Sequence, residues 1–298
     1  MNKKSLLKVI SGYAMWGILP LFWALLSPLD SIFVLANRLL WSALFTTALL
    51  AVTKKLPLLK QTFKDKRVMK FLIPAAIVIT CNWGVYIWSV SIGHVMDASL
   101  GYYMNPLAVA LCGMLVFKEK CTKLELFALL LAAAGVIFST IQLGKFPFVA
   151  LILAISFAAY GTFKKFAHAD SMASVAVETI IFAPFALLFI IFSPQGAASF
   201  AAMTPGLAVL CVCTGVVTAV PMILYSQGVN DLPFAVMGFM QYISPTLMLI
   251  VGIANGEPFT WMQAISFAFI WAGLVLYSVS LVRKEKQNKL EKAQQQKG

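Results

Sequence analysis

Long apolar runs, separated by short polar segments, follow one another along almost the whole chain. Most have about the 20 residues that a helix needs to cross a membrane. Ten such runs can be read, at residues 9–26, 32–52, 71–91, 98–117, 124–142, 148–163, 173–192, 206–227, 234–254 and 261–281. The sixth run is the shortest, so nine spans are the alternative. The pattern predicts an all-α, polytopic membrane protein with ten transmembrane helices.

The composition excludes other classes of protein. Hydrophobic residues make up 61% of the chain and charged residues 11%, against ~45–50% and ~25% in typical soluble domains. An ordinary soluble domain, a disordered chain and a coiled coil are therefore excluded. The first apolar run follows three lysines, but no small-residue cleavage site comes after it, so we interpret it as a span and not as a signal peptide.

The basic residues predict the orientation. Of the 23 lysines and arginines, 21 fall in alternate loops and the two tails, Lys145 lies on the opposite side, and Arg38 lies inside a span. Because cytoplasmic loops are enriched in basic residues, both termini are expected in the cytoplasm of a multi-pass cell-membrane protein. This bias also favours an even number of spans. The net charge of +12 then reflects sidedness, and nucleic acid is not an expected partner.

A spaced set of residues occurs twice. The first copy has Gly101, Pro106, Gly113, Glu119 and Gly135, and the second has Gly238, Pro245, Gly252, Glu257 and Gly273. Proline to the next glycine is seven residues in both copies, and glutamate to the later glycine is sixteen in both. Two five-span copies account for ten spans. The expected units are residues 1–143 and 144–282, followed by a basic cytoplasmic tail at 283–298.

An odd number of spans per copy means that the second copy crosses the membrane upside down relative to the first. The three lysines between spans four and five have no counterpart between spans nine and ten, which agrees with this inversion. Many secondary transporters are built from inverted repeats, with the substrate site near the membrane midplane between the halves.

Two prolines point to the same midplane region. Pro106 and Pro245 lie about eight and eleven residues into their spans, or roughly 12 and 17 Å deep at ~1.5 Å per residue. Each frees the carbonyl four residues earlier, at Tyr102 or Gln241. Such a carbonyl must face protein or a water-filled cavity. We expect a cavity there, and packing kinks satisfied by neighbouring helices are the alternative.

Several short strings along the chain carry a resemblance to a known family. They include Asn37-Arg38, Asn82-Trp83, Asp97-Ala-Ser-Leu-Gly-Tyr102, Asn105-Pro106-Leu107, Tyr160-Gly161, Glu178-Thr179, Gly238-Phe239 with Gln241-Tyr242, and Pro245-Thr246-Leu247. Together they resemble the RarD subfamily of EamA-type drug/metabolite transporters, from about Gly12 to Leu281. The resemblance implies two five-helix repeats and an inner-membrane permease for small molecules. One departure is Lys118-Glu119, where the family often has Gly-Glu.

Ionisable residues inside spans are the first functional candidates. Arg38 is expected to act as a fixed cation, paired with Asp97 or attracting an anionic substrate; a side chain that extends outward to the interface is the alternative. Asp97 and Glu178 are candidates for proton coupling. The alternatives are an exposed helix cap for Asp97 and a pair with Lys164 or Lys165 for Glu178. Glu119 and Glu257 are expected to have structural roles at turns.

Amides and aromatic rings near the expected cavity complete the predicted site. Asn82 and Gln241 lie near the middle of their spans, where an uncharged amide bridges helices or binds substrate. The aromatic residues could equally pack in the core or form interfacial belts. The predicted substrate-binding residues are Arg38, Asn82, Trp83, Tyr102, Asn105, Pro106, Tyr160, Gln241 and Pro245. No metal site or cofactor is expected.

The leading hypothesis for function is a secondary transporter of a small metabolite or drug-like solute. No Gly-x-x-x-x-Gly-Lys-Ser/Thr run is present, and no loop could hold a nucleotide-binding domain. A channel or a non-transporting regulator is the alternative. An enzyme is not expected, because the chain has two histidines, expected on opposite sides of the membrane, and neither Gly-x-Ser-x-Gly nor His-Glu-x-x-His.

Overall fold

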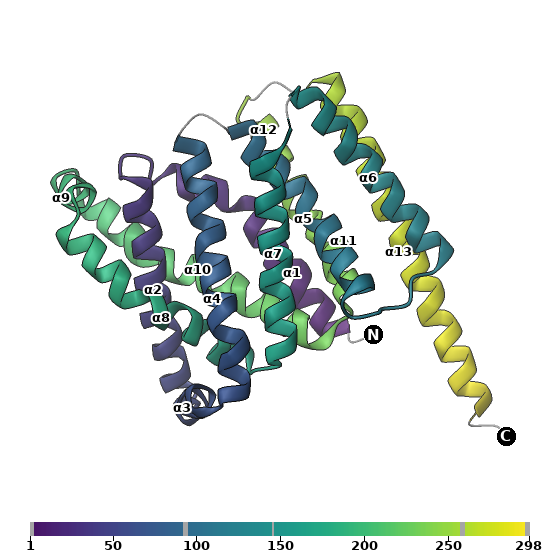
Figure 1. The fold of residues 1–298 in the computed structure, drawn as a ribbon, viewed down its shortest axis with the longest axis horizontal. Helices are drawn as coiled ribbons and strands as arrows, with labels where there is room; N and C mark the ends of the chain where they lie inside the picture. The colour runs from purple at the N-terminus through teal and green to yellow at the C-terminus, as the bar shows by residue number, and fades with distance from the viewer. Residues whose placement is uncertain (1–2, 92–94, 145, 257–259, 296–298) are drawn as a thin grey trace.

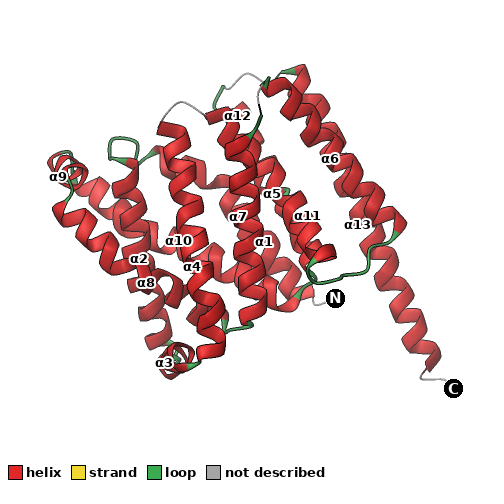
Figure 2. Ribbon diagram, in the orientation of Figure 1, coloured by secondary structure: helices red, strands yellow, loops and turns green. Residues whose placement is uncertain are grey.

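The computed structural model is helical over almost all of the residues that it describes (Figure 2). It describes residues 3–91, 95–144, 146–256 and 260–295, with side chains for all of these except 90–91, 95–97, 143 and 285–295. In chain order the helices are α1 (Lys3–Ala24), α2 (Ser31–Val52), α3 (Leu56–Lys64), α4 (Lys66–Ser91), α5 (Val95–Leu115), α6 (Lys123–Leu143), α7 (Phe148–Ala167), α8 (Ser171–Phe192), α9 (Pro194–Ala201), α10 (Pro205–Asp231), α11 (Phe234–Gln241), α12 (Ile243–Ala254) and α13 (Trp261–Gln295).

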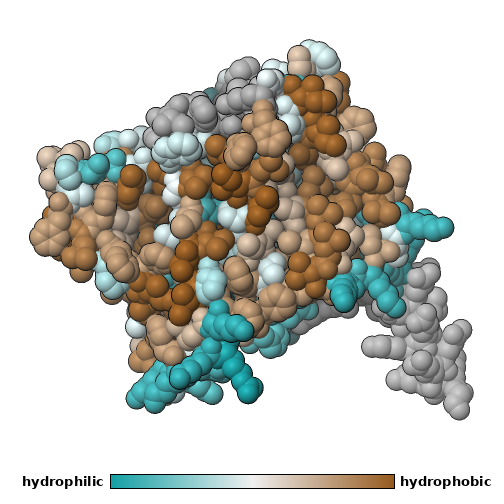
Figure 3. All heavy atoms as spheres, viewed as in Figure 1, coloured by the Kyte–Doolittle hydropathy of each residue, from teal (hydrophilic) through white to brown (hydrophobic). Residues whose placement is uncertain are grey.

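Ten segments within the described residues are long and apolar enough to cross a membrane, with α11 and α12 together forming one of them. This confirms the ten predicted spans and removes the nine-span alternative. Apolar side chains cover most of the face seen in Figure 3, and hydrophilic ones gather at its lower edge, where α3 and the beginning of α6 lie. The chain is a multi-pass, all-α membrane protein.

Some helix ends differ from the predicted spans. The sixth span, predicted to end at residue 163, continues to Ala167, so Lys164 and Lys165 lie in the last helical turn and not in a loop. Helix α13 runs on through the predicted tail to Gln295. Long polar side chains are good helix formers, so an apolar pattern alone underestimates where such helices end.

The ninth span, in which Pro245 predicts a kink, is broken into two helices. Helix α11 ends at Gln241, Tyr242 separates the two helices, and α12 begins at Ile243. Pro245 has no N–H to bond the Gln241 carbonyl, and the Tyr242 N–H bonds to the Phe239 carbonyl at 3.3 Å in a tighter turn. The equivalent helix of the first half, α5, continues through Pro106.

The packing of the helices has the pattern of an inverted repeat. Helix α4 packs on α7 and α8, and in exchange α10 packs on α1 and α2. The pairs α2 with α8, α5 with α11, and α6 with α13 also lie against each other. The two short helices follow α2 and α8, and they lie on opposite sides of the bundle, α3 at the lower edge and α9 at the upper left of Figure 1.

Glycines allow the equivalent helices to cross closely. A Cβ atom on Gly135 of α6 would lie 2.6 Å from the Ser266 carbonyl oxygen of α13. A Cβ atom on Gly273 of α13 would lie 2.6 Å from the Ala128 carbonyl oxygen of α6. Small residues of this kind let backbones approach each other in membranes.

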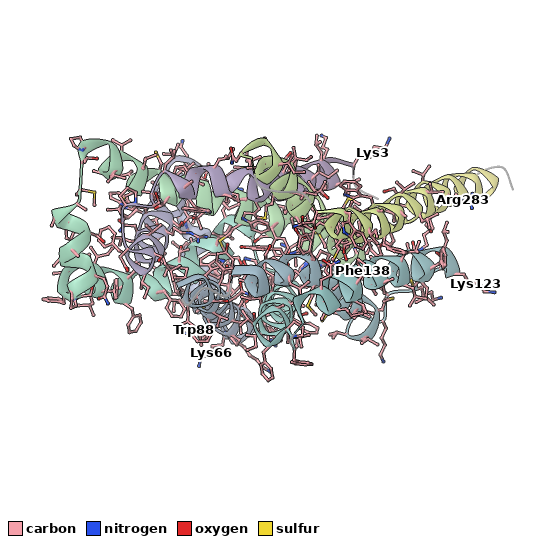
Figure 4. The ribbon with its side chains drawn as sticks, turned by 90° about the horizontal axis from the view of Figure 1, so that it is seen from above. Lys3, Lys66, Trp88, Lys123, Phe138 and Arg283 are labelled. Atoms are coloured by element: carbon pink, nitrogen blue, oxygen red, sulfur yellow. The ribbon has the colours of Figure 1, made fainter. Side chains whose placement is uncertain are left out.

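Figure 4 views the bundle along its helices. Lys66 and Trp88 lie near the two ends of α4, and their labels fall close together because α4 runs along the line of sight.

Candidate functional site

The guanidinium of Arg38 lies among side chains from three other helices. Its Cζ atom lies 4.5 Å from the ring centroids of both Trp23 on α1 and Trp83 on α4. Its Nε donates to Thr218 Oγ1 on α10 at 3.2 Å. Cation–π contacts with two indoles and a hydrogen bond from the other half of the chain thus hold the guanidinium inside the protein.

Two tyrosines extend this group. The rings of Tyr86 and Tyr102 meet edge to face with their centroids 5.5 Å apart. Both tyrosines also interact electrostatically with Arg38. We call these residues the Arg38 box, which comprises Trp23, Arg38, Trp83, Tyr86, Tyr102 and Thr218.

Asn82, the residue before Trp83 of the box, joins two helices. Its Nδ2 donates to the Leu153 carbonyl at 2.9 Å and to Ser156 Oγ at 2.7 Å, so α4 is tied to α7. The side chain is buried. This geometry is that of an interhelical bridge, one of the two roles considered for a mid-span amide.

A second charged group lies between α7 and α8. The Lys164 Nζ lies 2.6 Å from Glu178 Oε1, and the two side chains are 3% and 1% exposed. Ser174 Oγ donates to the same carboxylate oxygen at 3.0 Å, and Tyr160 Oη donates to Glu178 Oε2 at 3.0 Å. Every oxygen of this buried carboxylate therefore has a donor, as a stable buried ion pair requires. Glu178 pairs with Lys164, and Lys165 bonds elsewhere.

The two charged groups occupy equivalent places in the two halves. Asp30 caps α2 by accepting from Ile32 N, and Asp170 caps α8 by accepting from Met172 N, both at 2.9 Å. Arg38 and Glu178 each follow their capping aspartate by eight residues. Since eight residues of helix span about 12 Å, the two charges lie at similar depths measured from opposite ends of the bundle.

Aromatic rings pack beside Glu178, between the halves. Tyr160 stacks on Tyr225 with centroids 5.9 Å apart, and Tyr225 also contacts Trp16 of α1 at 5.6 Å. Tyr160 is 1% exposed and donates to Glu178. The structure thus places Tyr160, a predicted substrate-binding residue, in the packed interior beside the ion pair.

The proline regions are closely packed. A Cβ on Gly238 of α11 would lie 2.6 Å from the Pro106 carbonyl oxygen, so the two helices touch at this point. Pro245 is buried, and the neighbouring Ser244 Oγ donates to the Tyr13 carbonyl at 2.7 Å. Asn105 Oδ1 and Gln241 Oε1 are buried without a donor in the described part of the chain.

A cavity of about 410 Å³ lies away from the predicted substrate-binding residues, none of which lines it. Its walls come from both halves and include Glu119, Glu125, Phe239, Tyr277 and Lys284.

Glu119, expected at a turn, has a structural role of a different kind. Its carboxylate accepts from Phe234 N at 2.6 Å and Ala235 N at 2.8 Å, and so caps α11 in the other half. The side chain of Asp97 and all of Glu257 lie outside the described residues.

The EamA-like transporter family model matches residues 3–141 and 145–279. The chain belongs to this family. An uncharacterized transporter YojE of Bacillus subtilis is 38% identical over 97% of this chain and 98% of its own length. Protein RarD of Streptomyces exfoliatus is 33% identical over 97% and 92%, and protein RarD of Escherichia coli is 29% identical over 96% and 97%. These relatives confirm the RarD-type resemblance, and the chain is a membrane transporter.

A solved crystal structure shares the fold of this EamA-like transporter. It has a TM-score of 0.74 at 16% identity, and the match covers 96% of this chain and all of that chain. At this identity the likeness concerns the fold alone.

Half of the Arg38 box could be predicted from the sequence. Arg38, Trp83 and Tyr102 were predicted, whereas Trp23, Tyr86 and Thr218 were not. Lys164 was considered only as one of two partners of Glu178. Thr218 has a weak mid-span signal, because a hydroxyl in an apolar run needs an acceptor or donor partner, but its partner lies 180 residues away in sequence.

Proposed function

We propose that this EamA-like protein is a secondary transporter whose two halves, residues 1–143 and 144–282, alternate between states open to opposite sides of the membrane. The observation that carries the proposal is the exchange of helix contacts between equivalent elements: α4 with α7 and α8 against α10 with α1 and α2. Two oppositely oriented copies of one unit can exchange conformations, which opens and closes a site between them.

In this proposal both termini lie in the cytoplasm, as the bias of 21 basic residues over Lys145 favours. A small solute passes between the halves, near the Arg38 box and the predicted polar groups Asn105 and Gln241. The buried amide oxygens that lack a donor support this location, because such atoms gain most from a bound partner.

Glu178 is the proposed site of proton coupling. It is a buried carboxylate inside a span, and its ion pair with Lys164 can form or break as the surrounding helices move. Protonation of Glu178 would remove one charge of this pair and so favour a different arrangement of α7 and α8.

Counterflow in proteoliposomes tests the transport proposal. Vesicles preloaded with an unlabelled solute should accumulate the labelled solute transiently and saturably, whereas single-channel currents or non-saturable leakage would overturn the carrier mechanism. Arg38→Gln, which removes the cation of the box, should reduce this accumulation, and Arg67→Gln, at an exposed position, is its matched control.

Coupling is tested separately by solute-driven proton movement into the vesicles. Glu178→Asp keeps a titratable carboxyl group and should retain it, and Glu178→Gln should abolish it while solute exchange persists. Unchanged proton movement in the glutamine variant would rule out Glu178 as the coupling site.

A further inference from the structure

The guanidinium of Arg38 has unused hydrogen-bonding capacity. A guanidinium carries five N–H donors, and the one on Nε is bonded to Thr218. The four on the terminal nitrogens have no acceptor among the groups that the structure describes. The ion pairs of the described side chains join Lys164 to Glu178, Lys165 to Glu119 and Lys284 to Glu125, and Arg38 is in none of them.

The repeat explains why Glu178 has an ion-pair partner while Arg38 has none among the described side chains. Glu178 is neutralised by Lys164 of α7. The pairs Trp16-Gly17 and Tyr160-Gly161 align α1 with α7 and place Pro20 where α7 has Lys164. The first half therefore lacks a counter-charge for Arg38 at the position that supplies one for Glu178. A charge held inside a protein is costly unless a partner compensates it.

We propose that the Arg38 box binds the carboxylate of a small organic acid with an apolar or aromatic body, and that this carboxylate supplies the counter-charge that no described side chain provides. The planar fork of the guanidinium fits a carboxylate with two parallel hydrogen bonds. Tyr86 and Tyr102, whose rings pack together and which interact electrostatically with Arg38, add two hydroxyl groups to the box. Trp23 and Trp83 are partly exposed and offer indole surface to the body of the ligand.

One positive charge favours a carboxylate over a phosphate. A carboxylate and Arg38 together are neutral, whereas a phosphate dianion would leave a net negative charge in an apolar span. This inference rests on the proposed transport function for its physiological meaning, but the binding site can be tested without transport.

The test uses the full chain in detergent micelles and the fluorescence of its tryptophans. Benzoate is the carboxylate probe, benzamide is its neutral counterpart of nearly the same shape, and inorganic phosphate is the competing anion. We expect saturable quenching by benzoate, with an affinity at least about tenfold higher than for benzamide or phosphate, since hydrogen bonds to charged groups are the strong ones. The quenching should decrease in Trp23→Phe and Trp83→Phe and persist in Trp261→Phe, whose indole is 66% exposed.

Variants at Arg38 separate binding from folding. Arg38→Gln should weaken benzoate binding at least tenfold, Arg38→Lys should weaken it less, and Arg67→Gln should leave it unchanged. If Arg38 binds a ligand carboxylate, the glutamine variant without ligand should be close in stability to the parent chain, because removal of a charge without a counter-charge offsets the lost contacts with Trp23, Trp83 and Thr218. Equal binding of benzoate and benzamide, or benzoate binding that survives Arg38→Gln, would overturn the proposal.

A variant of Asp97, the predicted partner of Arg38, provides a further test. Asp97→Asn should leave benzoate affinity within about twofold; a gain of tenfold or more would mean that Asp97 occupies Arg38 and would overturn the assignment. Benzoate binding without flux of any carboxylate would support the carboxylate site and contradict the transport function. Flux of neutral solutes without carboxylate binding would support the transport function and contradict the carboxylate site.

Discussion

The buried ion pair of Lys164 and Glu178 allows a quantitative prediction. Glu178→Gln keeps one acceptor oxygen in place of two, for either Tyr160 or Ser174, and leaves the Lys164 ammonium, whose side chain is 3% exposed, without a counter-charge. Lys164→Met leaves the carboxylate without its cation. The double variant removes both charges and retains a polar group at position 178.

Each single substitution should destabilise the fold by about 3–5 kcal/mol, because it strands a buried charge. This is a large part of the ~5–15 kcal/mol by which folded proteins are stable. The double variant should lose less than either single variant, since no charge remains to be compensated. The two effects are therefore strongly non-additive, as expected for residues in direct contact.

Equilibrium unfolding in mixed detergent micelles measures these free energies, with Lys60→Met on the exposed surface of α3 as the control. The control should change stability by no more than about 0.5 kcal/mol. Additive losses in the double variant, or single losses below about 1 kcal/mol, would show that the pair is not held as a buried unit.

Three further substitutions, one with a glycine control, test a close helix crossing, the cap of α11 and the Asn82 bridge. Gly238→Ala should destabilise the fold by about 1–3 kcal/mol, because its Cβ would lie 2.6 Å from both the Ala110 nitrogen and the Pro106 oxygen. Gly84→Ala is the control: nothing lies within 4 Å of its Cβ, so it should be neutral or slightly stabilising in the same unfolding assay. Glu119→Ala should cost about 1–2 kcal/mol through the lost cap of α11, and a change below 0.5 kcal/mol would contradict that role. Asn82→Leu should cost about 0.6–1.7 kcal/mol by removing the bridge to Leu153 and Ser156, and unchanged stability would argue for a free amide.

The number and inversion of the spans could be predicted because both follow from one-dimensional properties. Length and apolarity set the spans, and an odd count per copy fixes the inversion. The helix ends could not be read in the same way. The last turn of α7 carries Lys164, which looks like a loop residue in a hydropathy pattern and is buried only because Glu178 lies across from it.

The break at Tyr242 did leave a signal in the sequence. Gly101 to Pro106 is five residues in the first copy, whereas Gly238 to Pro245 is seven in the second. The two additional residues fall in the segment where α11 ends and α12 begins. The contacts that Arg38 makes with Trp23, Trp83 and Thr218 left no comparable signal, because the three residues come from three helices and meet only through tertiary packing.

The duplicated positions divide into those that preserve the fold and those that differ in charge. The capping aspartates Asp30 and Asp170 are identical and make the same bonds, and Gly135 and Gly273 make reciprocal close crossings. Arg38 and Glu178, by contrast, carry opposite charges at equivalent places. A purely structural duplication has no need to invert the charge of a buried position, since an apolar residue there would be at least as stable. The charge difference is what the proposed ligand site predicts: one half would hold its own counter-ion in Lys164, and the other half would present Arg38 to a carboxylate.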